Sequence, residues 1–386
     1  MHKYIKYRGK KYFSSPFNIQ KSFLSFDLNY EDIVKLVYKK SEEYIKMILL
    51  SKCEPTENDK KKLSDYISKY GVSAEYFYSA GQAIIKLSGA TFALDENVLK
   101  SFPFVERVFE TSEPFHFVSR TYKKEDTVIE IKGEKGERKA EIGGGNFTFI
   151  AGPCAVESYE QITSLAKKLK SFGVTVLRGG AFKPRTSPYT FQGLNEEGIE
   201  LMKEAKRLTG LPVISEIPGE SALKYFDDVD ILQIGARNMQ NYALLREIGG
   251  ISKPVMLKRG MSATIREWLL SAEYIMNYGN ENVILCERGI RTFDTETRGT
   301  IDFSAVAIVK EKSHLPVIVD PSNSTGNRKL VSPSVLASAC FGADGVIVEV
   351  SDAPEETLCD GMQAISSREM RDIINETNKI LPLLKK

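Results

Sequence analysis

Short apolar runs recur along the last two thirds of the chain, and longer stretches with helical spacing separate them. We expect buried strands at the apolar runs 147–151, 174–177, 212–215, 231–234, 254–257, 283–285, 316–319 and 345–350. Continuous apolar runs are typical of parallel strands that are covered on both faces. We expect the main helices at 159–171, 195–207, 220–225, 241–247, 263–276, 304–310, 334–341 and 367–384.

Eight successive strand–helix units predict an α/β fold, a (β/α)₈ TIM barrel. The main rival is a doubly wound open sheet that binds a dinucleotide. It is disfavoured because no GxGxxG turn follows any of the expected strands.

A different pattern precedes the barrel, over residues 46–112. Apolar and alternating runs predict strands at 45–51, 72–79, 82–87 and 105–110, and helical spacing predicts helices at 56–70 and 94–102. The order βαββαβ is typical of a ferredoxin-like α+β domain. Such a domain binds small ligands or mediates assembly in many proteins, so the fold alone assigns it no function.

The rest of the chain is divided around these two domains. Residues 1–45 form an N-terminal extension of unknown role, with one amphipathic helix expected at 32–46 and packing on a neighbouring domain or subunit. Residues 113–126 are expected to be a linker. The barrel domain spans 127–386 and begins with a β-hairpin at 127–141.

Composition excludes several classes of partner. The 386 residues include 53 Lys and Arg against 51 Asp and Glu, and a net charge of +2 argues against nucleic acid. No apolar run approaches the ~20 residues that span a bilayer, and the N-terminus lacks a secretory signal. The five cysteines are scattered without a CxxC pair, which indicates free thiols and a cytoplasmic protein.

Basic residues follow the expected barrel strands. Active sites of such barrels lie at the C-terminal ends of the strands. There the sequence places Arg178, Lys183, Arg185, Arg237, Lys258 and Arg288. Cations gathered at one mouth repel one another unless anions lie between them. We therefore expect phosphates or carboxylates as ligands, most economically two phosphorylated substrates.

A second group at the same mouth combines a thiol with carboxylates. Cys154 follows the first barrel strand, Glu349 ends the last one, and Asp360 lies eleven residues later. Each has an ordinary structural explanation when taken singly. Together they are candidate ligands for a divalent metal beside the anion pocket.

These strand ends resemble 3-deoxy-D-arabino-heptulosonate 7-phosphate (DAHP) synthase, in the type I beta-like subgroup with an N-terminal ferredoxin-like domain. The resemblance extends from about Phe117 to the C-terminus and is weaker over 46–112. The segments that carry it are 150–158, 177–188, 191–194, 233–238, 257–260, 285–293 and 319–322.

The resemblance implies a transferase that condenses phosphoenolpyruvate with erythrose 4-phosphate to give DAHP and phosphate, the first step of the shikimate pathway to aromatic amino acids. It implies that Lys183, Cys154 and Asp320 are catalytic, with Lys183 supplying a proton. Phosphoenolpyruvate would be held by Arg178, Lys183, Arg237, Lys258 and Arg288, and the aldose phosphate by Arg185, Thr186 and Ser187. It also implies a homotetramer, with an aromatic amino acid as effector of the ferredoxin-like domain.

The sequence departs from the family at one metal ligand. The family holds its metal with Cys, His, Glu and Asp, which fall here on Cys154, Asn323, Glu349 and Asp360. None of the chain's three histidines is expected at the mouth: His2, His116 and His314. Three outcomes remain open. Asn323 binds metal through its amide oxygen and favours Mn or Mg over Zn, or the metal is dispensable, or the substrate or activity has changed.

Two alternative functions follow from that last outcome. The first is a phosphoenolpyruvate-dependent synthase that uses a different phosphorylated aldose. The second is a non-catalytic paralogue that binds phosphoenolpyruvate without turnover.

Overall fold

The computed structural model describes residues 4–7, 10–13, 47–79, 81–110, 114–132, 138–185 and 187–384, in two compact units that divide between Pro114 and Phe115. A short hairpin, β1 (Tyr4–Tyr7) and β2 (Lys10–Phe13), lies near the N-terminus. The helix expected at 32–46 lies outside the described residues, so the role of the extension stays a prediction. In the described part of the chain, none of the helices has the length and apolarity needed to cross a membrane.

The first unit contains the predicted ferredoxin-like domain. Its elements are β3 (Met47–Ser51), α2 (Glu57–Ile67), β4 (Ser73–Ser79), β5 (Gln82–Ser88), α3 (Glu96–Ser101) and β6 (Val105–Glu110). The strands pair antiparallel in the order β4-β5-β3-β6, as the βαββαβ pattern requires. Leu63 and Ile67 of α2 pack on the sheet with Leu49 and Ile85, and Thr56 begins that helix with a capping box to Asp59.

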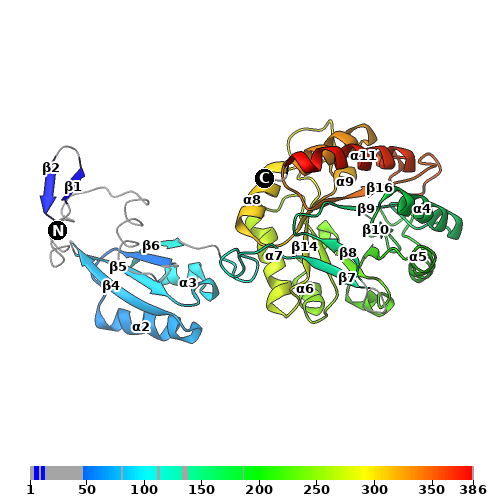
Figure 1. Ribbon diagram of the computed structural model, residues 1–386. Helices are drawn as coiled ribbons and strands as arrows, with labels where there is room; N and C mark the ends of the chain where they lie inside the picture. Colours follow the sequence, from blue (N-terminus) through cyan, green and yellow to red (C-terminus); the bar gives the residue numbers. More distant parts are fainter. Residues whose placement is uncertain are drawn as a thin grey trace. The chain divides into compact units, whose positions relative to one another are not determined.

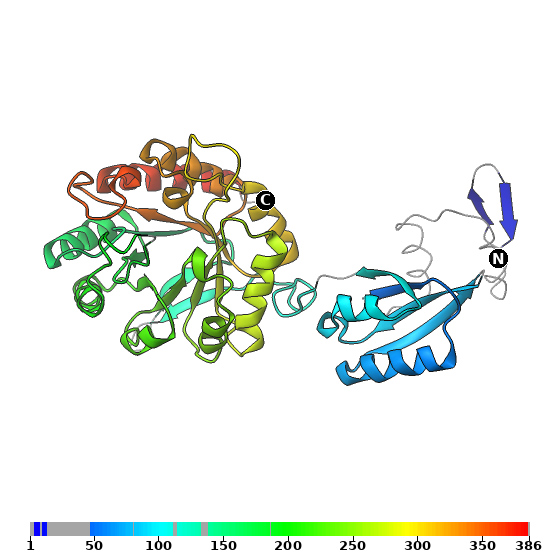
Figure 2. The same cartoon turned by 180° about the vertical axis from the view of Figure 1, so that it is seen from behind.

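The second unit is a closed barrel of eight parallel strands, as predicted (Figure 1). The strands are β9 (Thr148–Gly152), β10 (Val176–Arg178), β11 (Val213–Glu216), β12 (Ile231–Ile234), β13 (Val255–Lys258), β14 (Val283–Glu287), β15 (Val317–Val319) and β16 (Gly345–Glu349). Seen from behind, helices also cover the outside of the strands (Figure 2). The helices are α4 (Tyr159–Phe172), α5 (Glu196–Thr209), α6 (Tyr242–Gly249), α7 (Ile265–Asn277), α8 (Phe303–Lys312), α9 (Pro321–Thr325), α10 (Val331–Cys340) and α11 (Ser367–Leu384). The helix expected at 220–225 is instead a 3₁₀ helix, η4 (Glu220–Tyr225).

A β-hairpin closes one end of the barrel. It consists of β7 (Ile129–Lys132) and β8 (Arg138–Ile142), close to the expected positions. Its buried side chains form one cluster with those that line the interior of the barrel strands: Ile129, Ile131, Ala140, Ile142, Ile150, Val176, Ile214, Ile231, Met256, Ile284, Cys286, Ile318 and Ile347. The hairpin directly precedes the first barrel strand. It therefore closes the barrel at the N-terminal ends of the strands, opposite to the C-terminal ends where active sites lie.

Most of the segment expected to be a linker belongs to the barrel unit. The backbone N–H groups of residues 116–118 all donate to the carboxylate of Glu273 on α7, at 2.9–3.0 Å. Phe115 and Val118 are buried in the main core of the barrel. The apolar side chains in this segment favour packing on the barrel.

His314 lies before β15, at the N-terminal end of the barrel, as expected. Its Nε2 lies 2.7 Å from the carbonyl oxygen of Phe117 and its Nδ1 lies 2.8 Å from the hydroxyl of Thr127. The carbonyl can only accept, so Nε2 carries the proton. Thr127 in turn accepts from Lys123 and is free to donate to Nδ1. These contacts suit a neutral imidazole, and burial lowers the pKa of His314.

This buried histidine predicts a loss of stability in mild acid. Because the folded pKa lies below the unfolded value of about 6.5, the unfolded chain binds more protons between the two values. Stability of the barrel is therefore full above about pH 6.5 and falls as the pH drops toward the folded pKa. We expect His314→Gln to flatten the dependence of the melting temperature on pH below about 6.5. His116→Gln, from the adjacent segment, is the control. An unchanged slope in His314→Gln would contradict the assignment.

Candidate active site

A buried ion pair anchors the mouth of the barrel. Arg178 ends β10, and its Nη1 lies 2.8 Å from Oε1 of Glu349, which ends β16. Both side chains are almost fully buried. Burial alone would raise the pKa of Glu349, but Arg178 and Lys183 more than offset that cost and lower it to about 2. Glu349 is therefore a carboxylate at neutral pH, and Arg178 is its counter-ion.

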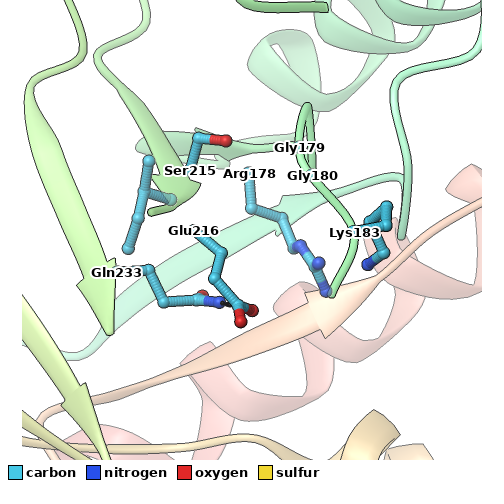
Figure 3. Close-up of a pocket in the computed structure, with 8 residues that line it drawn as sticks. Arg178, Gly179, Gly180, Lys183, Ser215, Glu216 and Gln233 are labelled. Atoms are coloured by element: carbon cyan, nitrogen blue, oxygen red, sulfur yellow. Dashed lines mark hydrogen bonds between the residues drawn. The ribbon is translucent and has the colours of Figure 1, made fainter. Parts of the chain in front are cut away.

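A small pocket opens beside this pair. It is lined by residues from the ends of neighbouring strands and the loop after β10: Arg178, Gly179, Gly180, Lys183, Ile214, Ser215, Glu216 and Gln233. Figure 3 shows the polar ends of Glu216 and Gln233 together, with the end of Arg178 drawn between Glu216 and Lys183. The side-chain amide of Gln233 donates to Glu216 at 3.0 Å. Arg178 and Lys183 supply two cations to this pocket and Glu216 one carboxylate, so the excess of positive charge suits an anion.

Lys183 reaches back from its loop to the end of the first barrel strand. Its Nζ donates to the carbonyl oxygen of Cys154 at 3.0 Å and lies 3.1 Å from the Cys154 sulfur. Gly180 makes this path possible, since a Cβ there would lie 2.7 Å from Cδ of Lys183. Burial opposes the charged amine, but the neighbouring sulfurs and Glu349 outweigh burial and raise the pKa of Lys183. Lys183 is thus a half-buried cation.

A second basic group lies at the ends of β13 to β15. The Nζ of Lys258 lies 2.5 Å from Oδ2 of Asp320, and both residues are buried. Asp320 also accepts from the backbone N–H of Asn323 at 2.9 Å, which caps α9. A guanidinium nitrogen of Arg288 lies 3.4 Å from the backbone oxygen of Asn323. Lys258 and Arg288 therefore both adjoin the short helix that follows β15.

The side chain of Asn323 connects the two groups. Its Nδ2 donates to Oδ2 of Asp320 at 3.1 Å and to Oε1 of Glu349 at 3.0 Å. A carboxylate can only accept, so the amide group that faces both must be the NH₂. Asn323 is therefore a hydrogen-bond bridge between two buried carboxylates.

Three candidate metal ligands lie at the edge of this mouth. Cys154, Cys359 and Asp360 each direct one donor atom into a group whose atoms all lie within 4.8 Å of one another. Asp360 carries a left-handed backbone, with φ of 53°, at a non-glycine residue. Arg185 adjoins the group, with Nη1 2.9 Å from the sulfur of Cys359 and 3.6 Å from Asp360.

The two thiols form a hydrogen bond with each other, in which either sulfur can be the donor. The contact with Cys359, together with burial, raises the pKa of Cys154. The same contact lowers the pKa of Cys359, despite its own burial, and nearby Lys183 and Arg185 act in the same direction. The pair therefore holds one negative charge more readily than an isolated buried thiol does.

The structure brings together most of the site residues expected from sequence. They are Arg178, Lys183, Arg185, Lys258, Arg288, Cys154, Asp320, Asn323, Glu349 and Asp360. Arg237 is exposed in η5 (Ala236–Asn238), at the end of β12. Ser187 is half-buried and its hydroxyl accepts from the backbone of Tyr189 at 3.4 Å, while Thr186 lies outside the described residues. The role of each of these residues stays a prediction.

Three residues at the mouth were missed. Gln363 donates to Glu349 and so completes the surroundings of that carboxylate. Arg259 pairs with Glu287 and Asp302 at 2.9 and 3.0 Å, next to Lys258 in sequence but in a separate ion-pair network. Cys359 is the third, and its position next to Asp360 in the sequence was a signal that could have found it.

Comparison with known proteins yields two matching family models. One, described as the DAHP synthetase I family, matches residues 121–383, and the other, described as the DAHP synthase ferredoxin-like domain, matches residues 47–113. Phospho-2-dehydro-3-deoxyheptonate aldolase of Thermotoga maritima is 45% identical over 339 residues, which is 88% of this chain and 98% of the relative. A 2-dehydro-3-deoxyphosphooctonate aldolase of Syntrophobacter fumaroxidans is 27% identical over 61% of this chain and 87% of its own.

Solved structures agree with these matches. The crystal structure of the Thermotoga maritima DAHP synthase has a TM-score of 0.78 and 44% identity, covering 88% of this chain and 98% of that one. A truncated form of the enzyme from the same organism has a TM-score of 0.63 and 47% identity, covering 69% and 96%. The resemblance inferred from the strand ends is therefore confirmed: this chain belongs to the DAHP synthetase I family.

Proposed function

We propose that this chain condenses phosphoenolpyruvate with erythrose 4-phosphate to give DAHP and inorganic phosphate. The observation that carries the proposal is the 45% identity over 88% of the chain to a phospho-2-dehydro-3-deoxyheptonate aldolase. The basic residues around the mouth give it a physical basis, because two phosphorylated substrates need cations between them.

The reaction balances with one water molecule. Carbon 3 of phosphoenolpyruvate forms a bond to the aldehyde carbon, and the aldehyde oxygen takes a proton. Water adds at carbon 2, and the bond from carbon 2 to the phosphate oxygen then breaks to release inorganic phosphate. Negative charge develops on the aldehyde oxygen during the first step, so a fixed cation or acid beside that oxygen lowers the barrier.

We divide these tasks among the basic residues of the mouth. Arg178 and Lys183 line the same small pocket, which supports their assignment to the carboxylate and phosphate of phosphoenolpyruvate. Lys183, a cation held by its surroundings, is the group we assign to donate the proton. Arg185 is less buried and lies further along the same loop, which supports its assignment to the aldose phosphate together with Thr186 and Ser187. Lys258, Arg288 and Arg237 would complete the phosphoenolpyruvate site.

The donors at the edge of the mouth fit a divalent metal. Proteins of this family are metal-dependent in general, and thiolate and carboxylate donors within 4.8 Å of one another suit such an ion. Cys154 and Asp360 would hold it, with Glu349 nearby as the family pattern implies. When bound, the metal would supply a Lewis acid that polarises the aldehyde oxygen. Metal binding through the amide oxygen of Asn323 would favour Mn or Mg. The two cysteine sulfurs in the group favour a softer ion.

A second candidate function is condensation with a different phosphorylated aldose. It is supported by relatives named 2-dehydro-3-deoxyphosphooctonate aldolase, whose identity to this chain is 26–29% over about 60% of its length. The higher identity and longer coverage of the DAHP synthase from Thermotoga maritima favour erythrose 4-phosphate.

We also propose that the ferredoxin-like domain is regulatory and binds an aromatic amino acid, in a cytoplasmic homotetramer. Support comes from the match of residues 47–113 to the DAHP synthase ferredoxin-like domain. All five cysteines are free thiols, in keeping with a reducing compartment. Activity assays with tyrosine and phenylalanine, and the mass of the protein in solution, test the two parts separately.

The substrate assignment predicts a clear preference in a direct assay. With a divalent metal supplied, loss of phosphoenolpyruvate absorbance should be at least about tenfold faster with erythrose 4-phosphate than with arabinose 5-phosphate, a difference of about 1.4 kcal/mol. Calorimetric titration with phosphoenolpyruvate alone, in the same protein sample, is the control for a folded site. Binding without turnover with either aldose would establish the non-catalytic paralogue, and a preference for arabinose 5-phosphate would establish the second candidate.

A further inference from the structure

The second cysteine at the mouth has no place in the metal site that the family pattern implies. The sulfur of Cys359 lies 3.1 Å from that of Cys154 and 3.5 Å from Oδ2 of Asp360. Cys154 itself lies 3.4 Å from the same carboxylate oxygen. Both cysteines are buried, with 6% and 3% of their surfaces exposed. Cys359 therefore lies as close to Cys154 and Asp360 as these two family-type metal ligands lie to each other.

The backbone at Asp360 is arranged to bring two adjacent side chains to the same place. Asp360 has a left-handed backbone, with φ of 53°, and the donor atoms of Cys359 and Asp360 both lie within 4.8 Å of the sulfur of Cys154. Such a conformation is uncommon at a residue other than glycine and is typical of functional sites. The loop is held by a hydrogen bond from the backbone of Leu358 to Glu157 at 2.9 Å.

The residue at the usual histidine position cannot supply a comparable ligand from the atoms it presents. Asn323 directs its amide nitrogen to Asp320 and Glu349, and an amide nitrogen has no lone pair to offer a metal. Among the described residues, His314 lies at the opposite end of the barrel and His116 lies in the segment packed on α7. A nitrogen ligand of the family type is therefore missing at the described part of the mouth.

Positive charge is already placed to balance two thiolates. The Nζ of Lys183 lies 3.1 Å from the sulfur of Cys154, and Nη1 of Arg185 lies 2.9 Å from the sulfur of Cys359. Each sulfur thus has its own cationic neighbour. This arrangement offsets the repulsion that two thiolates and a carboxylate would otherwise create around one ion.

We propose that Cys359 is a metal ligand that takes over the role of the missing histidine, so that Cys154, Cys359 and Asp360 form a two-thiolate site. Sulfur ligands select soft ions, whereas Mn²⁺ and Mg²⁺ prefer oxygen. The site therefore takes Zn²⁺, or Co²⁺ as its spectroscopic substitute, in preference to Mn²⁺ and Mg²⁺. The inference deepens the proposed function, but it is tested by metal binding without either substrate. Failure of turnover and failure of this site are therefore distinguishable.

The first test counts sulfur ligands by optical spectroscopy. The full-length protein is reduced, stripped of metal and titrated with Co²⁺, whose charge-transfer absorption grows with the number of bound thiolates. We expect Cys359→Ala to lose about half of the wild-type intensity and to bind Zn²⁺ at least about tenfold more weakly. Cys340→Ala, at an exposed cysteine of α10, is the matched control and should match wild type. Wild-type intensity and affinity in Cys359→Ala would overturn the proposal.

A second measurement needs no variant and covers the case in which Cys359→Ala does not fold. X-ray absorption of the Zn²⁺-loaded wild-type protein should show two sulfur neighbours at about 2.3 Å, with oxygen in the remaining positions. One sulfur neighbour would show that Cys154 alone binds the metal and would overturn the assignment of Cys359. Competition of Mn²⁺ against Zn²⁺ in the same sample should favour Zn²⁺, and a preference for Mn²⁺ would contradict the two-thiolate site.

Discussion

Replacement of Lys183 by methionine is expected to lower kcat by about 10²- to 10⁴-fold, the range that a positioned proton donor contributes. Methionine keeps the length and apolar stem of the side chain but removes the charge. The loss should fall on kcat more than on KM, because the proton is needed as charge develops on the aldehyde oxygen. The experiment follows phosphoenolpyruvate absorbance at saturating concentrations of both substrates.

Lys167→Met is the matched control for this change, since Lys167 is an exposed lysine of α4. It should leave kcat unchanged. Circular dichroism and the melting temperature of both variants separate a lost proton donor from a lost fold. A Lys183→Met protein that is folded and retains more than about a tenth of the wild-type kcat would contradict the assignment of Lys183 as the proton donor.

Replacement of Arg178 by methionine is expected to destabilise the barrel by about 3–5 kcal/mol, because it leaves the buried carboxylate of Glu349 without its main counter-ion. Glu349 keeps its hydrogen bonds from Gln363 and Asn323, but neither of these neutral groups supplies a charge. The urea midpoint of barrel unfolding, followed by circular dichroism, measures the change.

A double variant tests the cause of that loss. Adding Glu349→Gln to Arg178→Met removes the unpaired charge and should recover part of the lost stability, since replacing both partners of a buried pair costs less than removing one. Arg246→Met, on α6, provides the control for loss of an arginine away from the mouth. If the double variant is less stable than Arg178→Met alone, the destabilisation does not arise from unpaired charge.

The barrel could be predicted from sequence because its strands are buried on both faces. Runs such as Val283–Leu285 leave little alternative to a strand in a covered parallel sheet. The basic site residues followed from the same argument, since fixing a strand also fixes which residue ends it. Arg178 and Lys258 were found in this way.

The remaining features of the site depend on contacts that no local pattern encodes. Cys154 and Cys359 are 205 positions apart in the sequence, and the fold brings their sulfurs within 3.1 Å of each other. The bridging role of Asn323 depends on which end of its amide faces the carboxylates, which follows from the packed structure. Lys258 and Arg259 are adjacent in sequence, yet Lys258, the last residue of β13, pairs with Asp320, whereas Arg259, just after the strand, pairs with Glu287.

The hairpin β7–β8 also sets the N-terminal boundary of a barrel domain that is to be transferred to another protein. Its isoleucines are part of the interior of the barrel, so a chain cut just before β9 would expose an apolar surface at the sealed end. The segment before the hairpin also belongs to the barrel domain, since the backbone N–H groups of residues 116–118 donate to Glu273. For domain exchange between enzymes, the transferable unit begins at residue 115, and the join to a foreign N-terminal domain belongs at Pro114.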